Sequence, residues 1–110
     1  MTPTTTIADP VLRQFLTKIT PLRNKIEKII LFGSRARGDE KPYSDYDILV
    51  VVPQKDMRLK RSIRDAAFDV FLSLGRDISV KVLSLADFER TSALPTPFMK
   101  NVLRDGVLIG

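Results

Sequence analysis

The chain has 110 residues, the size of one ordinary domain, and its 44% hydrophobic and 28% charged residues are typical of a globular protein. The absence of cysteine and histidine excludes disulfides, zinc-finger ligation and imidazole bases, so any catalysis must use carboxylates, hydroxyls, lysine, arginine or a metal ion. The formal net charge of +5 either favours anionic partners such as nucleotides or simply keeps a small domain soluble.

Hydrophobic periodicity and turn residues predict eight elements in one domain. In chain order they are a helix from 9 to 21, a strand over 26–32, a short helix over 34–38, a strand over 47–52, a helix over 56–74, a strand over 77–83, a short helix from 84, and a last helix from 96 to 106. This order predicts an α/β (α+β) fold in which helices flank a mixed sheet of three or four strands.

Residues 1–110 are expected to form this single domain, with a frayed end over 1–8. No apolar run reaches the length of a membrane span, and the stretch MTPTTTIADP lacks the pattern of a secretion signal. We therefore expect a cytoplasmic protein that has no membrane contact.

A glycine-serine turn joins the first predicted strand to the short helix. Gly33 and Ser34 offer backbone N–H groups and a hydroxyl to a phosphate, and Arg35 and Arg37 add positive charge. The turn is not a Walker P-loop, because acidic residues stand where that motif needs Lys-Ser/Thr. Taken alone, the G-S pair more simply indicates a plain strand-to-helix turn, and the two arginines also fit a solvated helix face.

Two aspartates open the apolar strand DILVVV. Side chains at i and i+2 of a strand lie on the same face, about 6.5–7 Å apart, so Asp45 and Asp47 can both reach one cation. Carboxylate oxygens suit Mg²⁺, which proteins commonly share with substrate phosphates. The alternative is a polar loop in which Asp45 is a cap and Asp47 a solvated strand end.

Together, GSRARG, the loop and SDYDILV resemble the nucleotidyltransferase superfamily of DNA polymerase β type, and most of all the minimal nucleotidyltransferase (MNT) domain of paired HEPN/MNT toxin-antitoxin systems. The resemblance implies that Gly33 and Ser34 bind a nucleoside triphosphate, ATP or another NTP, and that Asp45 and Asp47 bind Mg²⁺. Arg35 and Arg37 are expected to join the nucleotide-binding residues by steering the triphosphate. The resemblance also implies in-line transfer of a nucleotide to an acceptor hydroxyl.

Members of the family that this sequence resembles carry a third carboxylate on a later strand. The most natural alignment places Lys81 at the position of that carboxylate. Asp77 is the alternative third metal ligand and catalytic acid. It lies about 13 Å from position 81 if the strand is regular, so it serves only if the strand is positioned differently. A plain turn residue after Gly75-Arg76 is the other interpretation of Asp77.

The function expected is transfer of AMP to a hydroxyl of a HEPN-type helical toxin, with this chain as the antitoxin. A catalytically degenerate module that neutralises the toxin by contact is the alternative, and an antibiotic nucleotidyltransferase is a third. Nucleic acid is not expected as a partner, because the basic positions between 55 and 64 lack interleaved aromatics. Base preference, acceptor residue and self-association are left open.

Overall fold

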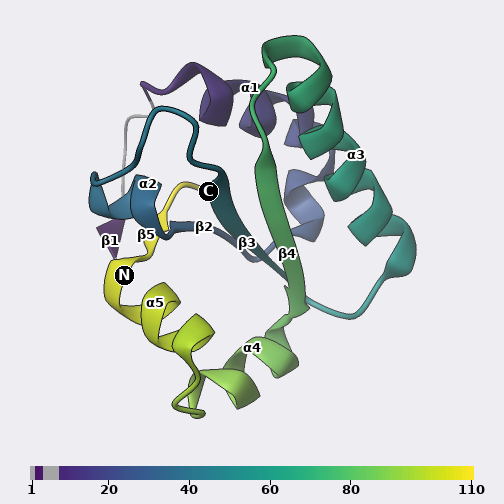
Figure 1. The fold of residues 1–110 in the computed structure, drawn as a ribbon. Coiled ribbons are helices and arrows are strands. Elements are labelled where there is room, and N and C mark those ends of the chain that lie inside the picture. The colour runs from purple at the N-terminus through teal and green to yellow at the C-terminus, as the bar shows by residue number, and fades with distance from the viewer. Residues whose placement is uncertain (1, 4–7) are drawn as a thin grey trace.

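The computed structural model describes residues 2–3 and 8–110, which form helices packed on both faces of one sheet (Figure 1). The elements in chain order are β1 (Thr2–Pro3), α1 (Pro10–Lys18), a 3-10 helix (Thr20–Lys25), β2 (Lys28–Phe32), α2 (Ser34–Arg37), β3 (Tyr46–Val52), α3 (Met57–Leu74), β4 (Ile78–Ser84), α4 (Leu85–Ser92), α5 (Pro97–Asp105) and β5 (Val107–Leu108). The predicted fold class, a mixed sheet flanked by helices, is confirmed.

The sheet has the strand order β1-β5-β2-β3-β4. β2 runs antiparallel to both β3 and β5, whereas β4 runs parallel to β3 after the crossover through α3. The short strands β5 and β1 pair with each other and widen the sheet beyond the three or four strands predicted. Residues 1 and 4–7, which make up most of the predicted frayed end, lie outside the described residues.

The helices begin where the sequence offers caps. Asp9 accepts hydrogen bonds from the backbone N–H groups of Val11 and Leu12 in the first turn of α1, and Asp56 accepts one from the N–H of Leu59 in α3. Ser84 and Thr96 cap α4 and α5, the two helices predicted to begin at these positions. The helix over 9–21 is shorter than predicted: α1 ends at Lys18, and the proline that follows lies in the 3-10 helix.

The sheet separates two hydrophobic layers. In Figure 1, α1 and α3 cover one face, and α4 and α5 lie below the other. β3 is buried on both faces, because Ile48, Val50 and Val52 pack under α1 and α3 whereas Leu49 and Val51 pack against α4 and α5. No helix in residues 2–3 and 8–110 is long and apolar enough to cross a membrane.

Candidate active site

Gly33 connects β2 to α2 in a conformation that only glycine adopts readily, with φ 76° and ψ −158°. A Cβ at this position would collide with the carboxylate of Asp47. Asp47 on β3 pairs with Phe32, the last residue of β2. The turn backbone therefore lies directly against the second aspartate. The predicted G-S turn and D-x-D motif meet at one end of the sheet, on the face of α4 and α5.

Asp45 and Asp47 differ in their surroundings. Asp45 is exposed and precedes β3 by one residue, whereas Asp47 is half-buried inside the strand. Burial raises the pKa of the Asp47 carboxyl above its usual value, and the Asp45 charge raises it further, while Lys81 and Arg37 lower it. Asp47 thus bears an unfavourable negative charge that a bound cation would stabilise.

Tyr46, between the two aspartates, points to the opposite face of the sheet. Its side chain is buried, and its hydroxyl donates a 2.7 Å hydrogen bond to Oδ2 of Asp9. Burial of the side chain and, to a smaller extent, this hydrogen bond raise the pKa of Tyr46 to about 12. The alternation of the strand explains the arrangement, because a residue between two same-face aspartates must face the other layer. Tyr46 therefore anchors the D-x-D segment to the cap of α1.

The two arginines of α2 are held by contacts within the protein. The guanidinium of Arg35 lies 4.3 Å from the ring centroid of Tyr46, and its Nη2 donates a 3.1 Å hydrogen bond to the carbonyl of Ser44. Arg37 forms 3.1 Å ion pairs with Asp39 and with Asp105 of α5. Arg35 therefore stabilises the loop before β3. The nucleotide-binding role of both arginines stays a prediction.

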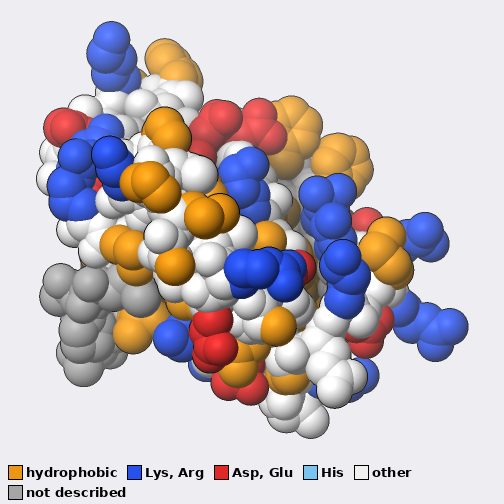
Figure 2. Space-filling view, turned by 90° about the horizontal axis from the view of Figure 1, so that it is seen from below, with side chains coloured by type: hydrophobic (Ala, Val, Ile, Leu, Met, Phe, Trp, Pro, Cys, Tyr) orange, Lys and Arg blue, Asp and Glu red, His pale blue; other side chains and the backbone are white. Residues whose placement is uncertain are grey.

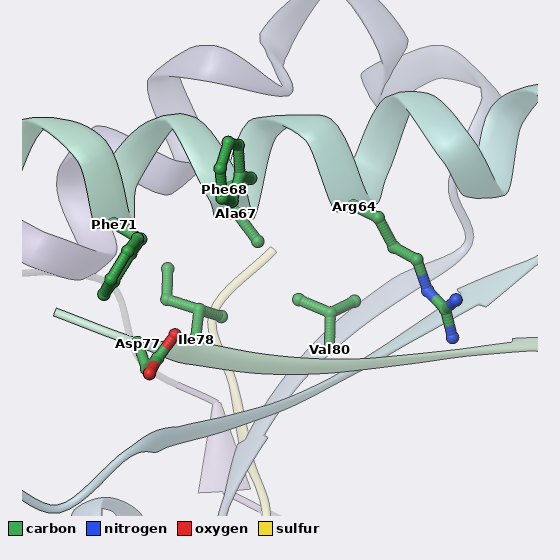
Figure 3. A pocket seen from close by; sticks show the side chains of 7 residues that line it. All are labelled: Arg64, Ala67, Phe68, Phe71, Asp77, Ile78 and Val80. Carbon is green, nitrogen blue, oxygen red and sulfur yellow. The ribbon is translucent and has the colours of Figure 1, made fainter.

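Asp77 lies just before β4 and not within the strand, contrary to the predicted bounds. Its backbone carbonyl accepts a 3.1 Å hydrogen bond from the N–H of Tyr46. Its side chain is exposed and lines a pocket of about 300 Å³ between β4 and α3, where Phe71 points toward the strand near Ile78 (Figure 3). Across residues 2–3 and 8–110, no three carboxylates gather into a group that could hold a metal ion.

Two residues of β4 face the site from the neighbouring strand. The parallel register pairs Asp47 with Ser79 and Leu49 with Lys81, so both β4 side chains share the face of Asp47. The sequence did not identify Ser79, since the register of a parallel pair cannot be read from local pattern. Two carboxylates still fit Mg²⁺, which proteins often bind through one or two carboxylates plus substrate phosphates.

A strand, a glycine turn that lies against the second aspartate of a D-x-D segment, and a parallel crossover are typical of a nucleotidyltransferase-type domain. Residues 14–110 match the family model described as "Polymerase beta, Nucleotidyltransferase". This match covers most of the chain, and the protein belongs to that family, as the motifs predict.

Curated relatives come from Methanocaldococcus jannaschii. The chain is 32% identical over 89 residues to "Putative protein adenylyltransferase MJ1305", an alignment that covers 77% of this chain and 60% of that protein. It is 46% identical over 44 residues to the similarly named MJ0604, covering 39% of this chain and 44% of that protein. The chain thus spans about half the length of these relatives.

Solved structures share the fold. A toxin-antitoxin crystal structure with AMP-PNP is 22% identical, with a TM-score of 0.57 over 94% of this chain and 73% of that chain. A structure of the tri-AMPylated Shewanella oneidensis HEPN toxin in complex with MNT antitoxin is 21% identical, with a TM-score of 0.50 over 91% of this chain and 71% of that chain. At these sequence identities the similarity shows a shared fold and nothing more.

Proposed function

We propose that the protein is a Mg²⁺-dependent nucleotidyltransferase that transfers AMP from ATP to a hydroxyl of a partner protein, a HEPN-type toxin that it neutralises. The observation that carries this proposal is the contact between the turn at Gly33 and the carboxylate of Asp47. A phosphate held by the turn would lie next to a carboxylate suited to a metal ion. The adenylyltransferase names of the relatives and the AMPylated toxin in a neighbouring structure support the choice of reaction.

The residues of the site have two roles, phosphate binding and metal binding. The hydroxyl of Ser34 and the backbone N–H groups at the start of α2 bind phosphate oxygens, and no side chain of the described residues caps this helix start. Asp45 and Asp47 would hold Mg²⁺, which supplies charge neutralisation at the triphosphate when bound. The acceptor hydroxyl attacks the α-phosphorus, its proton leaves to solvent or a carboxylate, and pyrophosphate departs in line.

The test is transfer of label from ATP to the partner. With Mg²⁺, α-labelled ATP and a HEPN-type partner, the wild-type protein should label the partner, and the double variant Asp45→Asn plus Asp47→Asn should not. Glu27→Gln provides a matched control, because this exposed acid precedes β2 at the end of the sheet opposite the aspartate pair. Equal labelling by wild type and the double variant would show that the site does not carry the reaction.

A degenerate module that acts by contact is the second candidate. It is favoured by the lysine on the β4 face of the site and by the lack, among the described residues, of a three-carboxylate group. The same double aspartate variant separates the two functions in cells. Full neutralisation of the toxin by the double variant would favour contact, whereas loss of neutralisation with the complex intact would favour catalysis.

The partner is proposed to dock on the exposed side of α3. Among the residues whose exposure the structure describes, 8–110, five of the eight strongly exposed large hydrophobic side chains belong to α3, including Phe68 and Phe71, whose rings stack at 6.2 Å. Basic side chains gather on the right of Figure 2, over the N-terminal half of this helix. The surface therefore suits a partner helix with apolar residues flanked by acidic ones. The pocket on this surface is lined at one end by Asp77, whose carbonyl is bonded to the N–H of Tyr46, the residue that follows Asp45.

Substitution of Phe68 and Phe71 by Ser tests this docking surface. Complex formation with the partner should weaken at least tenfold, because exposed aromatic side chains dominate such interfaces, while ATP binding stays unchanged. Leu94→Ser removes a similarly exposed hydrophobic side chain away from α3 and is the control. Unchanged association of the double Phe variant would place the partner elsewhere.

A further inference from the structure

Lys81 lies on β4, the strand that pairs with β3, where Asp47 is located. Since Leu49 pairs with Lys81 and Asp47 pairs with Ser79, Lys81 lies one diagonal step from Asp47 on the same face. The strand spacing and the rise per residue give a Cα separation of about 8 Å between Asp47 and Lys81. This distance is within reach of a lysine side chain, so the ammonium can approach a ligand held beside Asp47.

The surroundings of Lys81 leave its charge available. Nζ lies 5.7 Å from the ring centroid of Phe98, which supports the side chain from α5, and Lys81 forms no ion pair among the described residues. Arg37 already pairs with two carboxylates, and Arg35 donates to a backbone carbonyl. Of these three cations around the site, Lys81 is the one that has no acceptor in the described structure.

We propose that Lys81 binds a phosphate group of the nucleotide, so that the site holds a triphosphate through a protein cation as well as through Mg²⁺. An ammonium group repels a metal ion but is a common phosphate ligand. The position facing Asp47 is therefore a phosphate contact and not a lost metal ligand. This inference rests on the proposed function, since it assigns one more residue to the same nucleotide site.

Titration of ATP by calorimetry, once in EDTA and once in Mg²⁺, tests the inference. In EDTA, Lys81→Gln should weaken ATP binding about tenfold, in line with the loss of one charged hydrogen bond, and Lys81→Arg should retain most of the affinity. Lys28→Gln is the matched control, because Lys28 also lies over an aromatic ring, 5.3 Å from the centroid of Phe88, but on another strand. Binding of adenosine, which has no phosphate, should be equal in all variants.

The outcomes separate the two proposals. If the wild-type protein binds no ATP in either condition, the proposed function fails and this inference fails with it. If the wild type binds ATP and Lys81→Gln binds it equally well in EDTA, only the role of Lys81 is overturned. Lys81→Asp gives a further decision: Mg²⁺-dependent transfer at or below the wild-type level supports the phosphate contact, whereas transfer above the wild-type level would identify a lost metal ligand.

Discussion

Substitution of Gly33 by Ala should both destabilise the fold and disturb the aspartate pair. The backbone at Gly33 lies in a region that costs a residue with a side chain about 1–3 kcal/mol. The new Cβ would also press on the carboxylate of Asp47, which adds a cost of the order of 1 kcal/mol as the side chain is displaced. We therefore expect the free energy of unfolding to fall by about 2–4 kcal/mol.

Urea denaturation followed by circular dichroism measures this loss, with Gly38→Ala as the control. Gly38 also has a positive φ, 81°, but a Cβ there would meet no heavy atom within 4 Å, so only about 1 kcal/mol should be lost. The double variant Gly33→Ala plus Asp47→Ala removes the collision and should recover about 1 kcal/mol relative to additivity. Strict additivity of the two substitutions would refute the contact between the turn and the carboxylate.

Two further predictions concern the D-x-D segment. Tyr46→Phe removes the hydrogen bond to Asp9 and should cost about 1–2 kcal/mol of unfolding free energy in urea denaturation, whereas Tyr43→Phe, at an exposed position, should cost nothing measurable. Because the folded-state pKa of Asp47 is raised, the stability that this group contributes is present below the ordinary carboxyl pKa and is lost as the pH rises through the raised value. Asp45→Asn should lower the pKa of Asp47, which NMR titration measures. The same variant should stabilise the ligand-free protein by about 0.5 kcal/mol at pH 7 but not in acid. An unchanged pKa of Asp47 would contradict the coupling of the two carboxyls.

Local signals in the sequence were sufficient for most of the fold. The run DILVVV predicts a strand buried on both faces, and Asp9 and Thr96 mark helix starts, because these signals act within a few residues. The strands β1 and β5 could not be predicted, since two residues carry no periodicity and their pairing depends on the assembled sheet.

The candidate site was predictable to a smaller extent. The pairing of the G-S turn with D-x-D follows from two neighbouring elements and a known motif. The relation of Asp77 and Lys81 to Asp47 depends on the register between β3 and β4, which are joined through the 18-residue helix α3. No local pattern fixes that register, so the expected position of Lys81 rested on the family resemblance alone, and the structure places it diagonally across from Asp47, with Asp77 before the strand.

The bond between Tyr46 and Asp9 links two parts of the protein that are far apart in the sequence. One carboxylate oxygen of Asp9 accepts from the backbone N–H of Val11 at the start of α1, and the other accepts from the hydroxyl of Tyr46, which lies between the two aspartates. The first turn of α1 and the start of β3 should therefore open together, as one cooperative unit in amide hydrogen exchange. A ligand that orders the aspartates would then slow exchange at the amides of Val11 and Leu12.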